Sequence, residues 1–333
     1  MGPSSVVVLC VALVCVCAQD PKLYDAYFGK PLKGRRQTFL SQGLNTTTLC
    51  TVPVRACRKD EGRRVDGTCT NPKYPSRGAT LTPFPRLLPP IYGIGNTLRS
   101  AHDGSPLPSA RVLRTALLAD GQDRDEYFST LAHDFFAFVN VDNVDLLYMN
   151  RYIPLSDCCP NNQIPNAANP RCIPIMVQAD DPFLRRTGIR CMNLTRMETF
   201  QDYGCIPITL PAERYSRQPP LLELSVIYGN SELRNRQIRN GSDGILSYRM
   251  EEGREVPLGI SPLCIGNKPQ NLEVACYDFG DSHGGNIITS VTVTALWFFR
   301  EHNRLARELA KVNPCWDDDH LFETARQINI AQT

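Results

Sequence analysis

Hydrophobic residues recur every three or four positions over residues 124–139, which read RDEYFSTLAHDFFAFV. This spacing places them on one side of a helix with 3.6 residues per turn, so it predicts an amphipathic helix over residues 124–139. His133 and Asp134 lie within that helix. The apolar positions that share its predicted inner side are Phe128, Leu131, Phe135 and Val139.

A second long pattern runs from about residue 286 to 312. Its beginning, IITSVTVT, is rich in β-branched residues, whereas its end, REHNRLARELAKV, is rich in strong helix formers. Three aspartates at 317–319 then provide the start of a last helix. We expect that helix to leave its apolar face uncovered, which favours aggregation. The residues of this face are Leu321, Ala325 and Ile328.

The rest of the chain is rich in loops. Residues 72–110 contain many prolines and little periodicity, so we expect them to lie extended across a larger body. Residues 155–191 read as a loop with four cysteines, and two short patterns follow at 221–228 and 232–239. No internal repeat is visible. The fold class is therefore expected to be mainly α, with long loops tied by disulfides.

The N-terminus indicates secretion. Residues 6–16 form an unbroken apolar run of eleven, too short to span a bilayer, and Val16 and Ala18 fit a signal-peptidase site. The alternative is a buried N-terminal strand. We expect a signal peptide at residues 1–18, a pro-segment or linker at 19–49, and one domain at 50–333. Three sequons agree with secretion and predict glycosylation of Asn45, Asn193 and Asn240.

Composition narrows the class further. Lys and Arg number 36 against 34 Asp and Glu, so no single-sign field predicts binding to nucleic acid or to an anionic membrane. No later apolar run is long enough to span a membrane. Of 14 cysteines, three lie in the expected leader and eleven remain. No CxxC pair is matched for zinc, so disulfides with one unpaired thiol are the expectation.

A set of short motifs, in order along the chain, resembles the animal haem peroxidases, the superfamily of myeloperoxidase and chorion peroxidase. The resemblance covers roughly residues 50–330. It implies a mainly helical peroxidase domain, a haem cofactor, and hydrogen peroxide with phenolic, tyrosyl or halide donors as substrates. The motifs are DGTCTN at 66–71, RLLPPIY at 86–92, LPSAR at 107–111, LAHD at 131–134, CIPI at 172–175, SVIYG at 225–229 and REHNRLA at 300–306.

Within this resemblance His133 matches the distal histidine, which takes a proton from haem-bound peroxide and returns it to the leaving oxygen. Taken without the family, a single histidine on a helix is more often a core or surface residue. The family usually has Asp just before this histidine, for an ester bond to haem, and Gln four residues earlier. Here Ala132 and Ser129 stand there, and Ala132 has no oxygen for an ester. Any bound haem is therefore expected to lack that covalent link.

Asp134 matches a calcium-binding aspartate of the family. The partner loop of the family supplies oxygens at alternate positions, which here are Pro219, Leu221, Glu223 and Ser225. The resemblance therefore implies a calcium site formed by Asp134, Leu221, Glu223 and Ser225, although proline has replaced a hydroxyl residue and Glu has replaced Asp. A solvated acidic loop is the alternative.

A third site departs further from the family. Its Asp-x-Arg-x-x-Glu segment corresponds here to residues 281–287, DSHGGNI. Counting back from Arg300 puts Gly284 and Ile287 in the places of Arg and Glu, and one inserted residue puts His283 and Asn286 there. Both family residues are missing in either alignment. His283 is a weak candidate to replace the arginine, because neutral imidazole lacks a fixed charge.

The resemblance also implies two small loops closed by disulfides, Cys57–Cys69 and Cys264–Cys276. Cys172 is expected to pair with Cys158 or Cys159. Cys315 is the candidate for the unpaired thiol.

The proximal haem-ligating histidine of the family lies downstream of the segment that ends at Thr333, so we expect the chain to be C-terminally truncated relative to the family. His302 belongs to a different motif and is not expected to be an axial ligand.

Two functions remain open. One is a secreted haem peroxidase with impaired catalysis. The other is a non-catalytic secreted glycoprotein with an extracellular-matrix or cell-surface partner. A hydrolase is disfavoured because no G-x-S-x-G or H-E-x-x-H occurs.

Overall fold

The structure is a computed structural model, and it describes residues 50–59, 61–84, 86, 88–94, 97–117, 126–143, 158–163, 171–207, 209–259, 276–281 and 284–333. The chain divides into two compact units, and each is described by itself. Among the described residues, unit 1 is built from the segments within 50–51, 83–117 and 158–215, and unit 2 from those within 52–82, 126–143 and 216–333.

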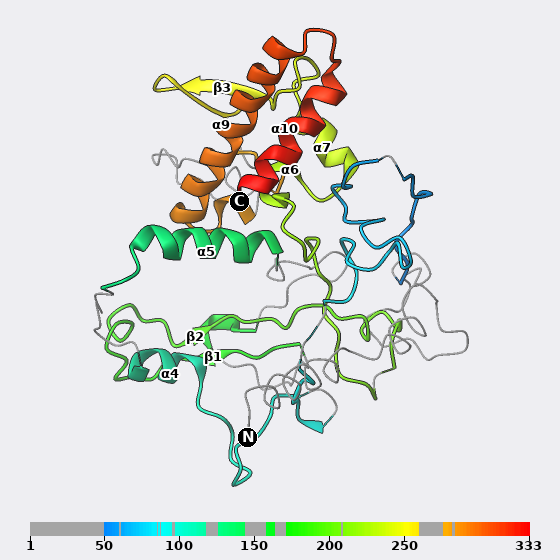
Figure 1. Cartoon of the computed structure of the whole chain (residues 1–333). Coiled ribbons are helices and arrows are strands. Elements are labelled where there is room, and N and C mark those ends of the chain that lie inside the picture. The colour runs from blue at the N-terminus through cyan, green and yellow to red at the C-terminus, as the bar shows by residue number, and fades with distance from the viewer. Residues whose placement is uncertain are drawn as a thin grey trace, which may run out of the picture. The chain divides into compact units, whose positions relative to one another are not determined.

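Unit 2 is mainly helical (Figure 1). A two-stranded antiparallel hairpin pairs Tyr248 with Pro257 and Glu251 with Arg254. The elements of unit 2 are α5 (Thr130–Asn143), α6 (Ser225–Tyr228), α7 (Glu232–Ile238), β3 (Tyr248–Glu251), β4 (Arg254–Pro257), η4 (Gly284–Asn286), α9 (Thr289–Val312) and α10 (Asp318–Gln332).

The core of unit 2 forms where α9 packs against α5 and α10, which lies beside α9 in Figure 1. Val291, Ala295 and Phe299 recur every four residues along α9 and are buried, as a helix with one apolar stripe requires. Phe138 of α5 stacks on Phe298 with ring centroids 5.4 Å apart. These contacts hold α5 against the core.

Two expectations about the helices need correction. The helix predicted over 124–139 begins later, at Thr130, and continues to Asn143. Phe128 and Leu131, two of its predicted inner residues, are exposed, since Phe128 precedes the helix and Leu131 lies in its first turn, before the buried Phe138 and Asp142. The expectation that α10 leaves its apolar face uncovered is wrong. Leu321 and Ala325 are buried, and Ala325 packs in a cluster with Leu305 and Ala306 of α9.

The start of α10 agrees with the sequence. Asp317 is its N-cap, and the Asp317 side chain accepts a hydrogen bond from the backbone N–H of His320. No helix among the described residues is long and apolar enough to cross a membrane.

Unit 1 contains little regular structure, namely α4 (Ala110–Leu117), the short helix η3 (Pro160–Asn162) and the strand pair β1 (Ile175–Met176) and β2 (Cys191–Met192). Three disulfides tie its loops together. They are Cys50–Cys205, Cys158–Cys172 and Cys159–Cys191. The second of them is one of the two pairings expected for Cys172. A mainly helical fold with disulfide-tied loops is therefore confirmed.

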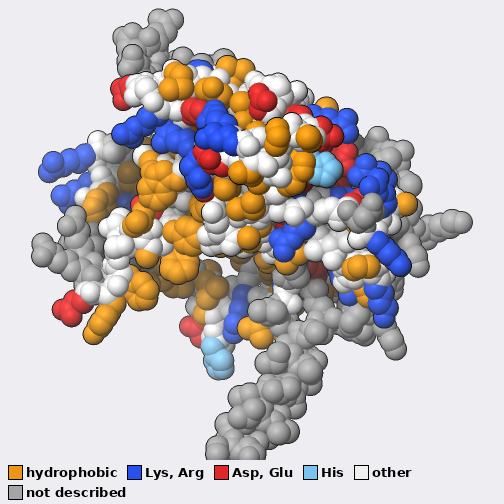
Figure 2. All heavy atoms as spheres, turned by 45° about the horizontal axis from the view of Figure 1, so that its top comes forward, with side chains coloured by type: hydrophobic (Ala, Val, Ile, Leu, Met, Phe, Trp, Pro, Cys, Tyr) orange, Lys and Arg blue, Asp and Glu red, His pale blue; other side chains and the backbone are white. Residues whose placement is uncertain are grey.

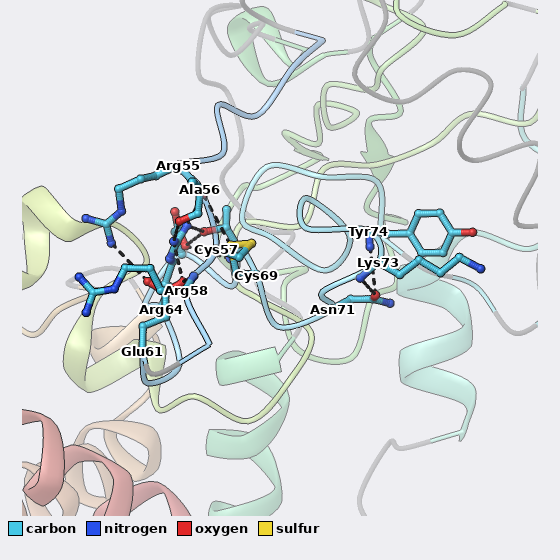
Figure 3. Close-up of a disulfide and its surroundings, with 12 residues drawn as sticks. Arg55, Ala56, Cys57, Arg58, Glu61, Arg64, Cys69, Asn71, Lys73 and Tyr74 are labelled. Carbon is cyan, nitrogen blue, oxygen red and sulfur yellow. Dashed lines mark hydrogen bonds and ion pairs between the residues drawn. A yellow bond between two sulfur atoms is a disulfide. The ribbon is translucent and has the colours of Figure 1, made fainter.

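Unit 2 contains the disulfide Cys57–Cys69, which closes the loop shown in Figure 3. Arg64 braces this loop from inside, since its guanidinium donates to the carbonyl oxygens of Arg55 and Ala56 and to the Glu61 carboxylate at 2.6–2.9 Å. Cys264 lies outside the described residues, so its pairing with the disulfide-bonded Cys276 stays a prediction. Cys315 is a free, exposed thiol.

Candidate functional site

Helix α5 places His133 on the face opposite its buried side. Phe138 and Asp142 are buried, whereas the His133 side chain is 77% exposed. Phe136 and Asn140 follow at positions +3 and +7, on the same face as His133, and both are exposed. The helix therefore presents an imidazole and an aromatic ring, one turn apart, outward from the core.

The carboxylate of the neighbour Asp134 lies beside this imidazole. His133 Nδ1 lies 3.5 Å from Asp134 Oδ1, and Nε2 has no hydrogen-bond partner in the described part of the chain. A proton on Nδ1 that faces the carboxylate leaves the lone pair of Nε2 free to act as a base.

His133 and Phe136 form an exposed face on which a haem could lie, and that face provides no side chain for the Asp-type ester. An exposed phenyl ring beside an exposed imidazole suits a flat, largely apolar macrocycle. Ala132, however, carries no oxygen. In segment 281–287, Gly284 is buried in η4. A Cβ atom added at this glycine would lie 2.8 Å from Asp281 Oδ2 and 2.9 Å from Val141 Cγ1. Position 284 thus has no room for an arginine side chain.

Asp281 and Asn286 of segment 281–287 serve the fold. Asp281 is buried and accepts hydrogen bonds from Arg217 at 2.8 Å and from the Gln218 side chain. Asn286 bonds both backbone groups of Tyr277. His283 lies outside the described residues and stays a prediction.

The loop predicted to bind calcium meets α5 through Asp142, a residue that sequence reasoning missed. The Asp142 carboxylate accepts hydrogen bonds from the backbone N–H groups of Glu223, Leu224 and Val226 at 3.0–3.3 Å. Burial raises the pKa of Asp142 to about 7, although these three donors lower it. The short helix α6 therefore receives a carboxylate cap from α5.

The loop residues predicted to bind calcium differ in burial and in their partners. Glu223 is buried and pairs with Arg63 and Arg326, and burial raises its pKa while the two guanidinium groups oppose that rise. Leu221 is half-exposed, and the buried Ser225 hydroxyl has no hydrogen-bond partner among the described residues. The described part of the chain contains no group of three or more His, Cys, Asp or Glu side chains placed to hold a metal ion. The calcium site stays a prediction.

His302 occupies a buried hydrogen-bond network instead of a ligand position. Its Nε2 lies 2.9 Å from the Gly244 carbonyl oxygen, so Nε2 carries the proton and donates it. Its Nδ1 therefore accepts from the Tyr228 hydroxyl at 2.9 Å, and that hydroxyl accepts from Asn329. Burial lowers the pKa of His302 to about 3, which keeps the imidazole neutral. Both nitrogens are thus used by the fold.

Of the three sequon asparagines, Asn193 and Asn240 are exposed, and Asn45 lies outside the described residues. The Asn240 amide donates to Ser242 of the same sequon at 2.9 Å, whereas Asn193 Oδ1 accepts from the backbone N–H of Cys158.

Comparisons with known proteins identify relatives of this chain. The family described as animal haem peroxidase matches residues 62–333. Chorion peroxidase of Aedes aegypti is 32% identical over 299 residues, which cover 85% of this chain and 36% of that protein. Peroxidase of Drosophila melanogaster is 30% identical over 291 residues, covering 85% and 42% respectively. The chain therefore spans well under half the length of these relatives.

Solved structures show the same fold. Peroxidase A from Dictyostelium discoideum superposes with a TM-score of 0.55 at 22% identity, covering 81% of this chain and 50% of that one. A fatty acid alpha-dioxygenase from Oryza sativa gives a TM-score of 0.51 at 18% identity, covering 81% and 36%.

Proposed function

Because this chain belongs to the animal haem peroxidase family, we propose that it provides His133 as the acid–base residue on the distal side of a haem site in a secreted glycoprotein. The observation that carries the proposal is the placement of His133. It lies on the outward face of a helix whose opposite face is anchored by Phe138 and Asp142. His133 and Phe136 would contact the haem, and haem when bound supplies the iron for peroxide chemistry.

The described residues support a proton-transfer role. Nε2 of His133 accepts a proton from the incoming peroxide and returns it to the leaving oxygen, while Asp134 holds the other ring nitrogen. A positioned acid–base residue of this kind contributes about 10²–10⁴-fold to a rate. By family, the donors would be small phenols, tyrosyl groups or halides.

The arginine that assists the distal histidine in the family is replaced in this chain. Gly284 leaves no space for the charge-stabilising arginine, and loss of one such electrostatic donor costs about 10²–10³ in rate. His283 is the one residue proposed to take over part of that role. We therefore propose a slow peroxidase with haem held without the Asp-type ester.

A non-catalytic secreted glycoprotein is the second candidate, and the same two positions favour it. Ala132 and Gly284 remove the ester oxygen and the space for the arginine, while the fold around them is retained. The disulfides and the exposed Asn193 and Asn240 suit an extracellular protein of either kind, including one with a matrix or cell-surface partner.

Haem titration of the purified chain separates these two functions. We expect a Soret band that saturates at one haem per chain, and we expect acid and organic solvent to extract all of that haem from the denatured polypeptide. Absence of a saturable Soret band would favour the non-catalytic glycoprotein. Haem that stays attached after extraction would contradict the inference from Ala132.

The role of His133 is tested by guaiacol oxidation with the haem-loaded chain. The variant His133→Gln should lower the turnover by about 10²-fold or more. The matched control is His320→Gln, because His320 is 72% exposed and also lies 3.5 Å from an aspartate, Asp317. Equal turnover of the two variants would contradict the proposal.

A further inference from the structure

The loop at residues 221–226 contains a buried ion pair at the position where the family resemblance predicts a metal ligand. Glu223 is 1% exposed, and its Oε2 lies 3.1 Å from Nη2 of Arg326, a fully buried residue of α10. Its Oε1 lies 3.3 Å from Nη1 of Arg63. Both carboxylate oxygens therefore already have a cationic partner.

Arg326 is fixed in place by further contacts. Its Nη1 donates to the carbonyl oxygen of Arg63 at 2.6 Å and to Glu323 at 3.2 Å, and its guanidinium lies 5.6 Å from the centre of the Tyr228 ring. A guanidinium stays charged at every relevant pH and offers a rigid set of donors. Arg326 therefore places a permanent positive charge against the loop.

The backbone of the loop is held independently of any ion. Asp142 accepts three backbone N–H groups with its two oxygens. The predicted calcium ligand of α5, Asp134, precedes Asp142 by eight residues, which corresponds to about 12 Å along a helix axis. The carboxylate by which α5 contacts the loop, that of Asp142, is thus already used as a hydrogen-bond acceptor.

We propose that the guanidinium of Arg326, together with Arg63, takes the place of a metal ion in this loop, so that the chain folds and holds α5 without calcium. Calcium requires six to eight oxygen ligands. Here each oxygen of Glu223 already lies against a guanidinium group, and the two guanidinium groups would repel a second cation. Ser225 offers one neutral hydroxyl, which has no hydrogen-bond partner among the described residues. The residues present therefore do not fit calcium.

The first test measures the thermal unfolding midpoint of the full chain in EDTA and in calcium at about 10 mM, above the weakest dissociation constants of extracellular calcium modules, roughly 10⁻³ M. We expect the two midpoints to agree within error and isothermal titration to show no calcium binding. A higher midpoint in calcium, or binding of one ion per chain, would overturn the proposal.

The second test uses the sign of the effect of Glu223→Gln in EDTA. A buried carboxylate that lacks its metal destabilises the fold, so its neutralisation would raise the midpoint. If Glu223 is the ion-pair partner of Arg326, the variant leaves the buried charge of Arg326 without that partner. The variant should then lower the midpoint, by roughly 10 °C. A raised midpoint would contradict the proposal.

Glu323→Gln is the matched control, because Glu323 contacts the same guanidinium but is 42% exposed. We expect its midpoint to change by roughly 2 °C or less. Arg326→Met should lower the midpoint as Glu223→Gln does, and the double variant should recover part of the loss, since it leaves neither charge unpaired. Additive losses in the double variant would show that Arg326 and Glu223 do not act as a pair.

Discussion

The two units of this chain are stabilised in different ways. Unit 2 buries a continuous apolar core between α5, α9 and α10, and it fixes its loops with buried polar contacts such as Asp142 and the Arg326–Glu223 pair. In the described residues of unit 1 one α-helix is present, α4 of eight residues, which buries no residue, and the described segments are linked by three disulfides. Unit 1 also buries residues such as Phe200 and Tyr215, so its cross-links supplement side-chain packing that lies outside helices.

The residues of the proposed site belong to the unit that is stabilised by helix packing. The described residues proposed for the distal site lie in unit 2, on α5 and in segments packed with it. On the face drawn in Figure 2, Lys and Arg side chains are interspersed with Asp and Glu side chains and with hydrophobic ones. Because α5 packs on α9, the position of His133 depends on packing within unit 2.

Reduction of the disulfides should have the largest effect, and it should leave the packed helices α9 and α10 of unit 2 intact. Each disulfide of unit 1 contributes about 3–5 kcal/mol by restricting the unfolded chain. We expect a thiol reductant to remove hydrogen-exchange protection from peptides of residues 171–207, while peptides of α9 and α10 keep theirs.

The control for this prediction is the double variant Cys158→Ala with Cys172→Ala, which removes one cross-link without reductant. It should lower protection in residues 171–207 in the same direction. Loss of protection in α9 and α10 on reduction would show that unit 2 also depends on its cross-links.

In unit 2 a change in packing should have the next largest effect. Phe138→Ala removes a fully buried ring that stacks on Phe298, and it should lower the free energy of unfolding by about 3–5 kcal/mol. Phe136→Ala makes the same chemical change on the exposed face of the same helix and should change it by about 0.5 kcal/mol or less. Chemical denaturation measures both, and similar losses would contradict the assigned faces of α5.

The cap that Asp142 provides should show a pH dependence of smaller size. Burial raises the pKa of Asp142 to about 7, against about 4 in an unfolded chain. Between these values the folded chain binds a proton that the unfolded chain lacks. The free energy of unfolding therefore gains from this group as pH falls from 7 to 4, by at most about 1.4 kcal/mol per pH unit, and loses that gain as pH rises through 7.

The variant Asp142→Asn has no such proton. The difference in stability between the native chain and the variant should therefore grow as pH falls from 7 to 4, as measured by denaturation at several pH values. A difference that stays constant with pH would show that Asp142 is ionised throughout this range.

The sequence predicts some of these features and not others, for physical reasons. His133 and the start of α10 are local signals, a motif and a run of aspartates, and both fall on helices in the structure. The cap by Asp142 joins residues 84 positions apart, and Arg326 meets Glu223 across 103 positions. One-dimensional spacing contains no record of such contacts. The same limit explains the wrong start of α5 and the wrong expectation of an uncovered face on α10.

The central claim, that the outward face of α5 receives haem at His133, is tested most directly by labelling histidines with diethyl pyrocarbonate and mass spectrometry. Without haem, exposed His133 and His320 should both react, whereas buried His302 should not. With one equivalent of haem, we predict that labelling of His133 falls and that labelling of His320 stays unchanged. Equal labelling of His133 with and without bound haem would contradict the account.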